Sequence, residues 1–164
     1  VVIEKPGYGL VFGRIVVIRD GEDQLAAFPR FYKEFGWVLS QLKTGKKYVV
    51  SPLTQDGPFV LALPAGLYEI TKLMYEERVG LWEGHLLARF SVQPDGVAYL
   101  GTWAIEFTNL GPSSKIVGRV VNQLDEARED LKQNYAGKLQ PITVGLLESA
   151  KEGYLSLVRP RAEQ

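Results

Sequence analysis

The chain is built largely from short segments with the composition of β-strands, and turn signals separate them. Residues 86–92 show the pattern best, because apolar side chains occupy every second position and share one side of the predicted strand. These apolar residues are Leu86, Ala88, Phe90 and Val92. The segment ends at Gln93-Pro94-Asp95-Gly96, a strong turn sequence. This pattern predicts strands that form an antiparallel sheet with one buried face.

Seven further segments of the same kind precede Asn122. They cover residues 10–19, 37–42, 47–51, 59–63, 67–75, 97–107 and 116–121. The second and third flank Lys43-Thr44-Gly45-Lys46, which predicts a hairpin. No helical segments alternate with these strands, so the parallel sheet of a dinucleotide-binding fold is not expected. The sequence therefore predicts a mainly β protein: an antiparallel β-sandwich of about seven or eight strands with one C-terminal helix.

The pattern changes from strand to helix at Asn122, a suitable N-cap residue. Apolar residues then recur at the helical period, and a glycine suited to a helix C-terminus follows. They are Leu124, Ala127, Leu131, Tyr135 and the glycine Gly137. One helix over residues 123–136 is predicted. The chain thus divides into a β-sandwich, residues 1–121, and a helix with a tail, residues 122–164, packed on or extending from the sandwich. Whether residues 138–164 join the core is left open by the sequence.

Composition limits the chemistry that the chain can perform. Its 164 residues are enough for one domain, and 19 basic residues balance 19 acidic ones to a formal net charge of zero. A general nucleic-acid-binding protein normally carries a basic surplus, so nucleic acid is not an expected partner. The absence of cysteine excludes disulfides and thiolate sites, and the single histidine excludes sites of several histidines. We expect no metal, no other cofactor, no catalytic residue and no enzymatic activity; a hydrolase with paired carboxylates ranks last among the hypotheses.

Three phrases in the strand region resemble one known family when they are taken together. They are GLVFGRIVV at residues 9–17, FVLALPAGLYEI at residues 59–70 and FSVQPDGVAYLGTWAIEF at residues 90–107. Their order is similar to that in the prealbumin-like β-sandwich domains, also called transthyretin-like or carboxypeptidase-regulatory-like, and especially in small bacterial envelope lipoproteins of unknown function. In that family a strand enters an lPaGxY turn, and a later strand carries a pG..yYlG element.

The first of these family elements also has a plain physical basis. Pro64 and Gly66 favour a tight reversal of the chain. Two residues later, the ring of Tyr68 can cover the end of a sandwich while its hydroxyl reaches backbone or water.

The resemblance covers residues 10–121 and implies an antiparallel β-sandwich in a protein of the bacterial cell envelope. A periplasmic or outer-membrane-associated location is therefore expected, with a cytoplasmic location as the alternative. The chain departs from the family in having no lipid-bearing cysteine, and in the helix and tail that extend beyond the shared core. It begins without methionine and without a signal peptide, so a mature or trimmed form is expected.

Aromatic side chains near loops are the best candidates for a binding site. Tyr75, Trp82 and His85 bracket a charged hairpin. Trp37 belongs to a second aromatic segment, together with Phe28, Phe31 and Tyr32. Rings exposed at such positions can stack on sugars or dock a protein partner. The alternative, which we favour for these rings, is that they cover the open ends of the sandwich.

We therefore expect a non-enzymatic structural or interaction module that presents loops and sheet edges to a protein partner. The partner would be another envelope protein or a second copy of the chain, and a membrane would be reached only through a lipid anchor outside the given residues. The alternative is a carbohydrate- or small-ligand-binding module that uses exposed aromatic residues.

Overall fold

A computed structural model describes residues 6–19, 21–23, 35–50, 58–77, 80–107, 114–134 and 141–160. Most of these residues lie in strands, and the helix among them is α2 (Leu124–Asn134). The strands are β1 (Tyr8–Arg19), β2 (Glu22–Asp23), β3 (Phe35–Gln41), β4 (Lys47–Val50), β5 (Pro58–Pro64), β6 (Gly66–Glu77), β7 (Gly80–His85), β8 (Ala88–Val92), β9 (Val97–Phe107), β10 (Ser114–Val121), β11 (Ile142–Val144), β12 (Glu148–Ser149) and β13 (Glu152–Pro160). The predictions of a mainly β protein and of a helix after Asn122 are confirmed, but the helix is not C-terminal, because β11, β12 and β13 follow it.

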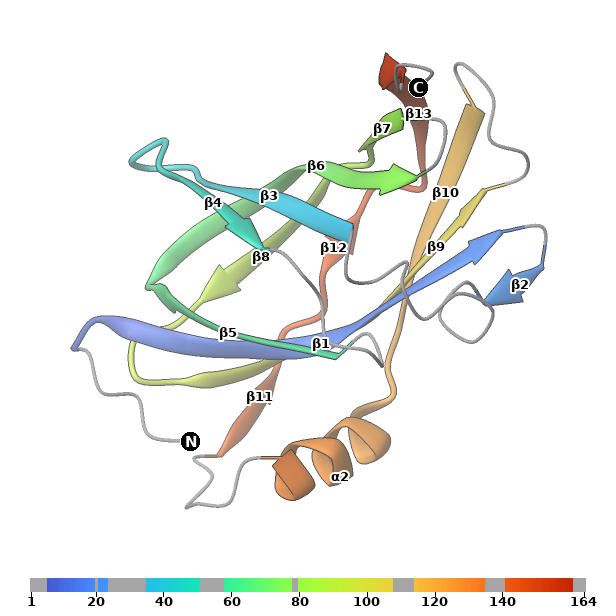
Figure 1. The fold of residues 1–164 in the computed structure, drawn as a ribbon. Coiled ribbons are helices and arrows are strands. Elements are labelled where there is room, and N and C mark those ends of the chain that lie inside the picture. Colours follow the sequence, from blue (N-terminus) through green and yellow to red (C-terminus); the bar gives the residue numbers. More distant parts are fainter. Residues whose placement is uncertain are drawn as a thin grey trace.

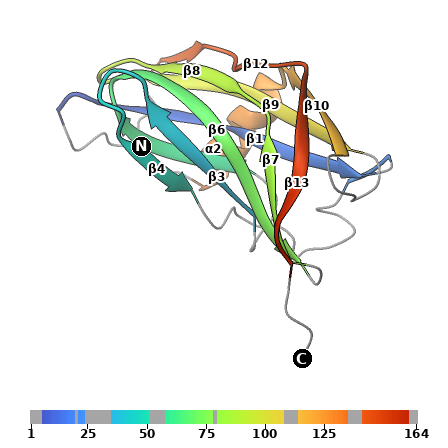
Figure 2. The same cartoon turned by 90° about the horizontal axis from the view of Figure 1, so that it is seen from above.

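The strands of the described ranges join into one curled sheet (Figure 1; Figure 2). Its main path runs in the order β12-β8-β6-β7-β13-β10-β9-β1-β2. Strand β3 pairs with β6 and carries β4, while β5 pairs with β1. Most neighbours are antiparallel, but β1 runs parallel to β9 along almost its whole length, and β11 is also parallel to β9.

The predicted antiparallel sandwich is therefore confirmed only in its coarser, mainly β part. The sheet is mixed rather than antiparallel, and it has more strands than the seven or eight predicted. Two strands in a hairpin are joined by a turn that the sequence reveals, whereas a parallel pair needs a long connection with no local signature. The pairing of β1 with β9 brings together two long apolar segments that are far apart in the chain.

The C-terminal residues form part of the same sheet. Strand β13 lies between β7 and β10 and is antiparallel to both (Figure 1). Strand β12 pairs with β8, and β11 with β9. Leu147 and Leu155 are buried in the main core. The question that the sequence left open is thus answered for residues 141–160, which belong to the sheet and contribute Leu147 and Leu155 to the core.

Two apolar clusters lie on opposite faces of the sheet. The larger one fills the inside of the curl, and its largest fully buried side chains include Trp37, Tyr68 and Trp103. The smaller one comprises Leu10, Phe12, Val97 and Tyr99 on β1 and β9, and Leu124 and Ala127 of α2 pack against it. The helix therefore covers the outer face of β1 and β9 with the apolar positions expected to face a sheet.

The helix begins where its cap residue predicts. The Asn122 side-chain oxygen accepts a hydrogen bond from the Leu124 backbone N–H at 3.2 Å, and Asp125 and Glu126 place negative charge in the first turn. The described part ends at Asn134. Tyr135, predicted to belong to the apolar stripe, lies outside the described residues.

Three predicted turns are confirmed. Gly45 has a φ of 69° in the turn between β3 and β4, and Asp95 has a φ of 57° in the turn between β8 and β9. Both residue types tolerate the left-handed region. At the third turn, between β5 and β6, the Tyr68 hydroxyl donates a hydrogen bond to the Pro64 carbonyl at 2.6 Å. The predicted contact of this hydroxyl with the backbone is therefore present.

Candidate interaction surface on the outer face of the sheet

One row of side chains across three strands combines an imidazole, a phenol and an ammonium group. Tyr154 on β13 pairs with His85 on β7 and, on its other side, with Lys115 on β10. Residues paired directly across strands carry their side chains on the same face. The rings of His85 and Tyr154 stack, with centroids 4.6 Å apart and an interplanar angle of 21°. Tyr154 is 53% exposed, so its ring remains accessible to a partner.

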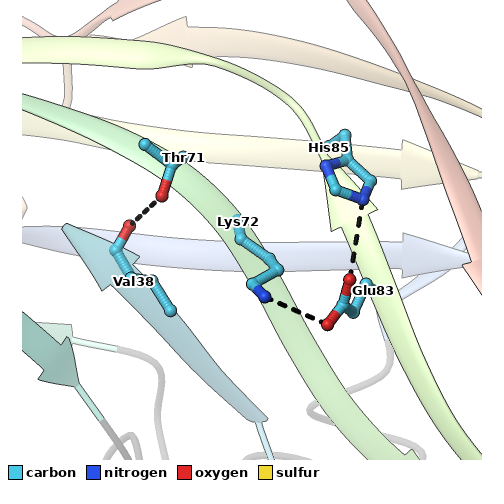
Figure 3. Close-up of polar contacts among 5 residues, drawn as sticks. All are labelled: Val38, Thr71, Lys72, Glu83 and His85. Carbon is cyan, nitrogen blue, oxygen red and sulfur yellow. Dashed lines mark hydrogen bonds and ion pairs between the residues drawn. The ribbon is translucent and has the colours of Figure 1, made fainter. Parts of the chain in front are cut away.

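A single carboxylate connects this row to β6. Lys72 Nζ donates to Glu83 Oε1 at 3.1 Å, and His85 Nε2 lies 3.7 Å from Glu83 Oε2 (Figure 3). Strand β7 alternates between buried and partly exposed residues, so Glu83 and His85 share the outer face opposite buried Trp82. The carboxylate therefore binds the ammonium group of Lys72 and lies close to the imidazole of His85.

A β-bulge places Lys72 on the outer face. Val38 pairs with Lys72 but the next residue, Leu39, pairs with Ile70, so Thr71 is an extra residue on β6. The Thr71 hydroxyl donates to the Val38 carbonyl at 3.4 Å (Figure 3). In a regular strand Ile70 and Lys72 would share one face. The extra residue separates them, with Ile70 in the core and Lys72 beside Glu83.

Close approach of β13 to β7 depends on Gly153. A Cβ atom at this position would overlap the backbone carbonyl oxygen of His85. Because backbone cannot move aside as a flexible side chain can, this position requires glycine. Gly153 thus allows the adjacent Tyr154 to pair with His85.

Two further ion pairs flank the central row. Arg89 Nε lies 2.8 Å from Glu69 Oε2, and Lys115 Nζ lies 2.7 Å from Glu152 Oε1. We call the whole set the outer polar face, which consists of Glu69, Lys72, Glu83, His85, Arg89, Lys115, Glu152 and Tyr154. Its acidic and basic groups occur in pairs, and the exposed Tyr154 ring lies in a row between His85 and Lys115.

The residues predicted to form a binding site do not come together at the surface. Trp37 is 0% exposed and Trp82 is 2% exposed, so neither ring is available at the surface as a binding site would require, and the favoured alternative of a covering role fits both better. Each belongs to the core cluster inside the curl. Tyr75 pairs with Trp82 in the sheet, but its side chain lies outside the described part of the structure. Of the four candidates, His85 is the one shown on the outer face.

The segment with Phe28, Phe31 and Tyr32 also lies outside the described residues.

Sequence reasoning missed Tyr154, the most exposed ring of the outer polar face. A signal was available, because Gly153, Leu155 and Leu157 alternate with Tyr154 and Ser156. This period of two predicts a strand with Tyr154 on the polar side. The alternation extends over few residues and contains a glycine, which weakens the signal.

The arrangement can bind a partner through stacking, hydrogen bonds and paired charges. Within the described ranges, no group of three or more His, Asp or Glu side chains is placed to hold a metal ion. Nor does the described part contain a helix with the length and apolar character needed to cross a membrane.

Comparison of the chain with protein-family models, curated proteins and solved structures finds no match.

Proposed function

We propose that the chain is a non-enzymatic interaction module that binds a protein partner through the outer polar face. The observation that carries the proposal is the stacked pair of His85 and Tyr154, in which the Tyr154 ring is exposed beside paired charges. A tyrosine held by a neighbouring ring loses little conformational freedom when a partner covers it, and tyrosine is enriched among residues that dominate binding energy.

The surrounding charges support recognition of a protein rather than of a highly charged polymer. Glu83 and Glu152 are each matched by a lysine, and Glu69 by Arg89. A surface with both signs of charge selects a partner with the complementary pattern and disfavours partners that place like charges together. It offers no continuous basic stripe of the kind that tracks a phosphate backbone.

The proposal also includes the prealbumin-like relationship, its two-layer sandwich and the cell envelope as the setting. The three sequence phrases support this part, and so does the contact of Tyr68 with Pro64 within the lPaGxY turn. The partner is then another envelope protein or a second copy of the chain.

Site-specific photo-crosslinking tests the partner. A benzophenone amino acid replaces Tyr154 in cells that express the chain, and the adducts are separated by mass. We expect one discrete protein adduct. The change Glu83→Gln should reduce its yield by about fivefold or more, because the carboxylate holds Lys72 and lies beside His85.

The matched control places the same crosslinker at Val49, which is 65% exposed on β4. Equal adducts from positions 49 and 154 would show that the outer polar face has no special role. The stability of Glu83→Gln is measured in parallel, and a change below about 1 kcal/mol is expected for partly exposed ion pairs. If Glu83→Gln stays folded but no longer forms the crosslink, the loss reports on binding of the partner.

The carbohydrate-binding alternative is supported by the same exposed ring, since a sugar can stack on Tyr154. Retention of the chain on an immobilised polysaccharide, abolished by Tyr154→Ala, would favour this alternative. Retention that is unaffected by the change would exclude the outer polar face as the sugar site.

A further inference from the structure

The turn between β3 and β4 concentrates positive charge in a protein whose formal net charge is zero. Lys43, Lys46 and Lys47 all lie in or beside this turn. None of their ammonium groups forms an ion pair with a described residue, whereas Lys72 and Lys115 each have a carboxylate partner. The turn therefore carries three unmatched positive charges.

Two exposed leucines accompany these lysines. Gln41 pairs with Tyr68, so the next residues, Leu42 and Leu67, lie opposite one another, and the Leu42 N–H donates to the Leu67 carbonyl at 2.9 Å. Residues that lie opposite in this way carry their side chains on the same face. Leu42 is 43% exposed and Leu67 is 47% exposed. We call residues 42–47 together with Leu67 the hairpin tip, which lies at one end of the sheet (Figure 1; Figure 2).

Hydrogen bonds fix the conformation of the hairpin tip. The Thr44 hydroxyl donates to Gln41 Oε1 at 3.0 Å and accepts from the Lys46 backbone N–H at 3.2 Å. Gln41 Nε2 donates in turn to the Ala65 carbonyl at 3.3 Å, which ties the hairpin to the turn between β5 and β6. A surface that is already ordered loses little conformational freedom when it binds.

Neighbouring groups leave the charge of the hairpin tip in place. Glu69, the first acidic residue of β6, is already paired with Arg89, whose Nε lies 2.8 Å from Glu69 Oε2. Lys46 Nζ lies 5.2 Å from the centroid of the Tyr48 ring, and an aromatic ring attracts an ammonium group without neutralising it. The hairpin tip thus combines apolar side chains with positive charge.

We propose that the hairpin tip binds the surface of an anionic lipid bilayer. Leu42 and Leu67 enter the boundary between headgroups and acyl chains, while the three lysines lie against the lipid phosphates. Lysines attract anionic lipids because the surface potential of such a bilayer is negative. The inference is independent of the proposed function, because it uses none of the residues of the outer polar face and requires no protein partner.

The exposure of the hairpin tip favours a bilayer over an acidic protein. All six residues from 42 to 47 are exposed, so the tip is a projection and not a groove. A protein partner would need a pocket shaped to receive this projection and its apolar side chains. A bilayer accepts apolar side chains without a preformed pocket, and it supplies phosphates around them.

Sedimentation with lipid vesicles tests the proposal on the intact chain. We expect binding to vesicles made of equal parts phosphatidylcholine and phosphatidylglycerol, and none to vesicles of phosphatidylcholine alone. The combined variant Lys43→Gln, Lys46→Gln and Lys47→Gln should lower the partition coefficient by about fivefold for each lysine, or about 100-fold in total. Its unfolding temperature should stay close to that of the unmodified chain, because the three side chains are exposed.

A matched control removes the same amount of charge elsewhere. Arg119, Arg128 and Lys151 are exposed and lie outside the hairpin tip. Their combined replacement by glutamine should change the partition coefficient by about twofold or less, because salt screens charges that do not touch the bilayer. An equal loss of binding in the two triple variants would overturn the proposal, since general attraction to anionic lipid would then explain the result.

A fluorescent label tests whether the leucines enter the bilayer. The chain has no cysteine, so Leu42→Cys creates a single site for the environment-sensitive dye NBD. We expect its emission to shift to shorter wavelength and to rise when anionic vesicles are added. The control is Leu87→Cys with the same dye, because Leu87 is 51% exposed but lies outside the hairpin tip, and its emission should stay unchanged. Equal shifts at the two positions would contradict insertion of the tip.

Two other outcomes would overturn the proposal. Absence of binding to anionic vesicles is expected if the lysines serve only to prevent β4, at an edge of the described sheet, from pairing with other chains. A response of the label at position 42 to soluble polyglutamate but not to vesicles would show that the hairpin tip recognises an acidic protein segment.

Discussion

At the scale of single residues, Tyr68 shows how one side chain stabilises a turn and the core together. Its ring is fully buried and stacks on Phe90, while its hydroxyl holds the Pro64 carbonyl. This role was predictable because Pro64, Gly66 and Tyr68 are close in sequence. The burial of Trp37 and Trp82 was not predictable in the same way, since an aromatic residue suits a core as well as a binding surface.

Replacing Tyr68 with phenylalanine should destabilise the fold at neutral pH. The change keeps the ring but leaves the Pro64 carbonyl without its donor. The free energy of unfolding should fall by about 0.5–1.5 kcal/mol, measured by urea denaturation. Tyr154→Phe, which alters an exposed hydroxyl, is the control and should change stability by less than about 0.5 kcal/mol.

The same residue predicts how stability depends on alkaline pH. Burial raises the pKa of the Tyr68 phenol above its ordinary value, and the neighbouring Tyr48 phenol adds to the effect. Above about pH 10 the unfolded chain ionises this tyrosine while the folded chain keeps it neutral, so stability falls as pH rises. The difference in free energy of unfolding between the unmodified protein and Tyr68→Phe should therefore become smaller from pH 9 to pH 11. Parallel curves over this range would contradict the burial argument.

At the scale of elements, the alternation of side chains in β8 could be predicted, whereas the bulge in β6 could not. Strand β8 alternates strictly between buried and exposed positions. In β6 the extra residue Thr71 changes the face of every residue that follows it, and its effect depends on pairing with Val38 in β3. The sequence of β6 alone does not contain that partner. The outer position of Lys72 is for this reason a product of pairing.

Pairing of β13 with β7 should be abolished by one added methyl group. In Gly153→Ala the new Cβ overlaps the His85 carbonyl oxygen, which is backbone. We expect a loss of about 2–3 kcal/mol or more, measured by thermal and urea unfolding. Gly145→Ala is the control, because a Cβ at position 145 meets nothing within 4 Å. A similar loss in both variants would contradict the proposed steric cause.

At the scale of the whole molecule, the sheet is continuous only because the last described strand completes it. Strand β13 lies between β7 and β10, although it is the last of the strands in chain order. The half formed by β6 and β7 is thereby joined to the half formed by β9 and β10. The division into a sandwich of residues 1–121 and an appended tail was drawn along the sequence, while the structure joins strands from both parts in one sheet.

Truncation after Lys151 should therefore prevent cooperative folding. The truncated chain lacks β13, which leaves the facing edges of β7 and β10 without their partner and removes Leu155 from the core. Circular dichroism and urea denaturation should show no sharp unfolding transition. Removal of residues 161–164 alone is the control. A cooperative transition in the shorter chain would show that β13 is an accessory strand.

The sequence by itself determined the strand-rich class, the main turns, the Tyr68 contact and the start of the helix. Each of these depends on residues that are close together in the chain. There the spacing of apolar residues, the backbone conformation that each residue prefers and the reach of its side chain determine the local structure. Tertiary structure alone decided the parallel pairing of β1 with β9, the insertion of β13 and the burial of Trp37 and Trp82. It also placed Tyr154 beside His85, because that contact requires two distant strands to meet in one register. Long-range pairing depends on the summed burial of many side chains, and no short segment encodes that sum.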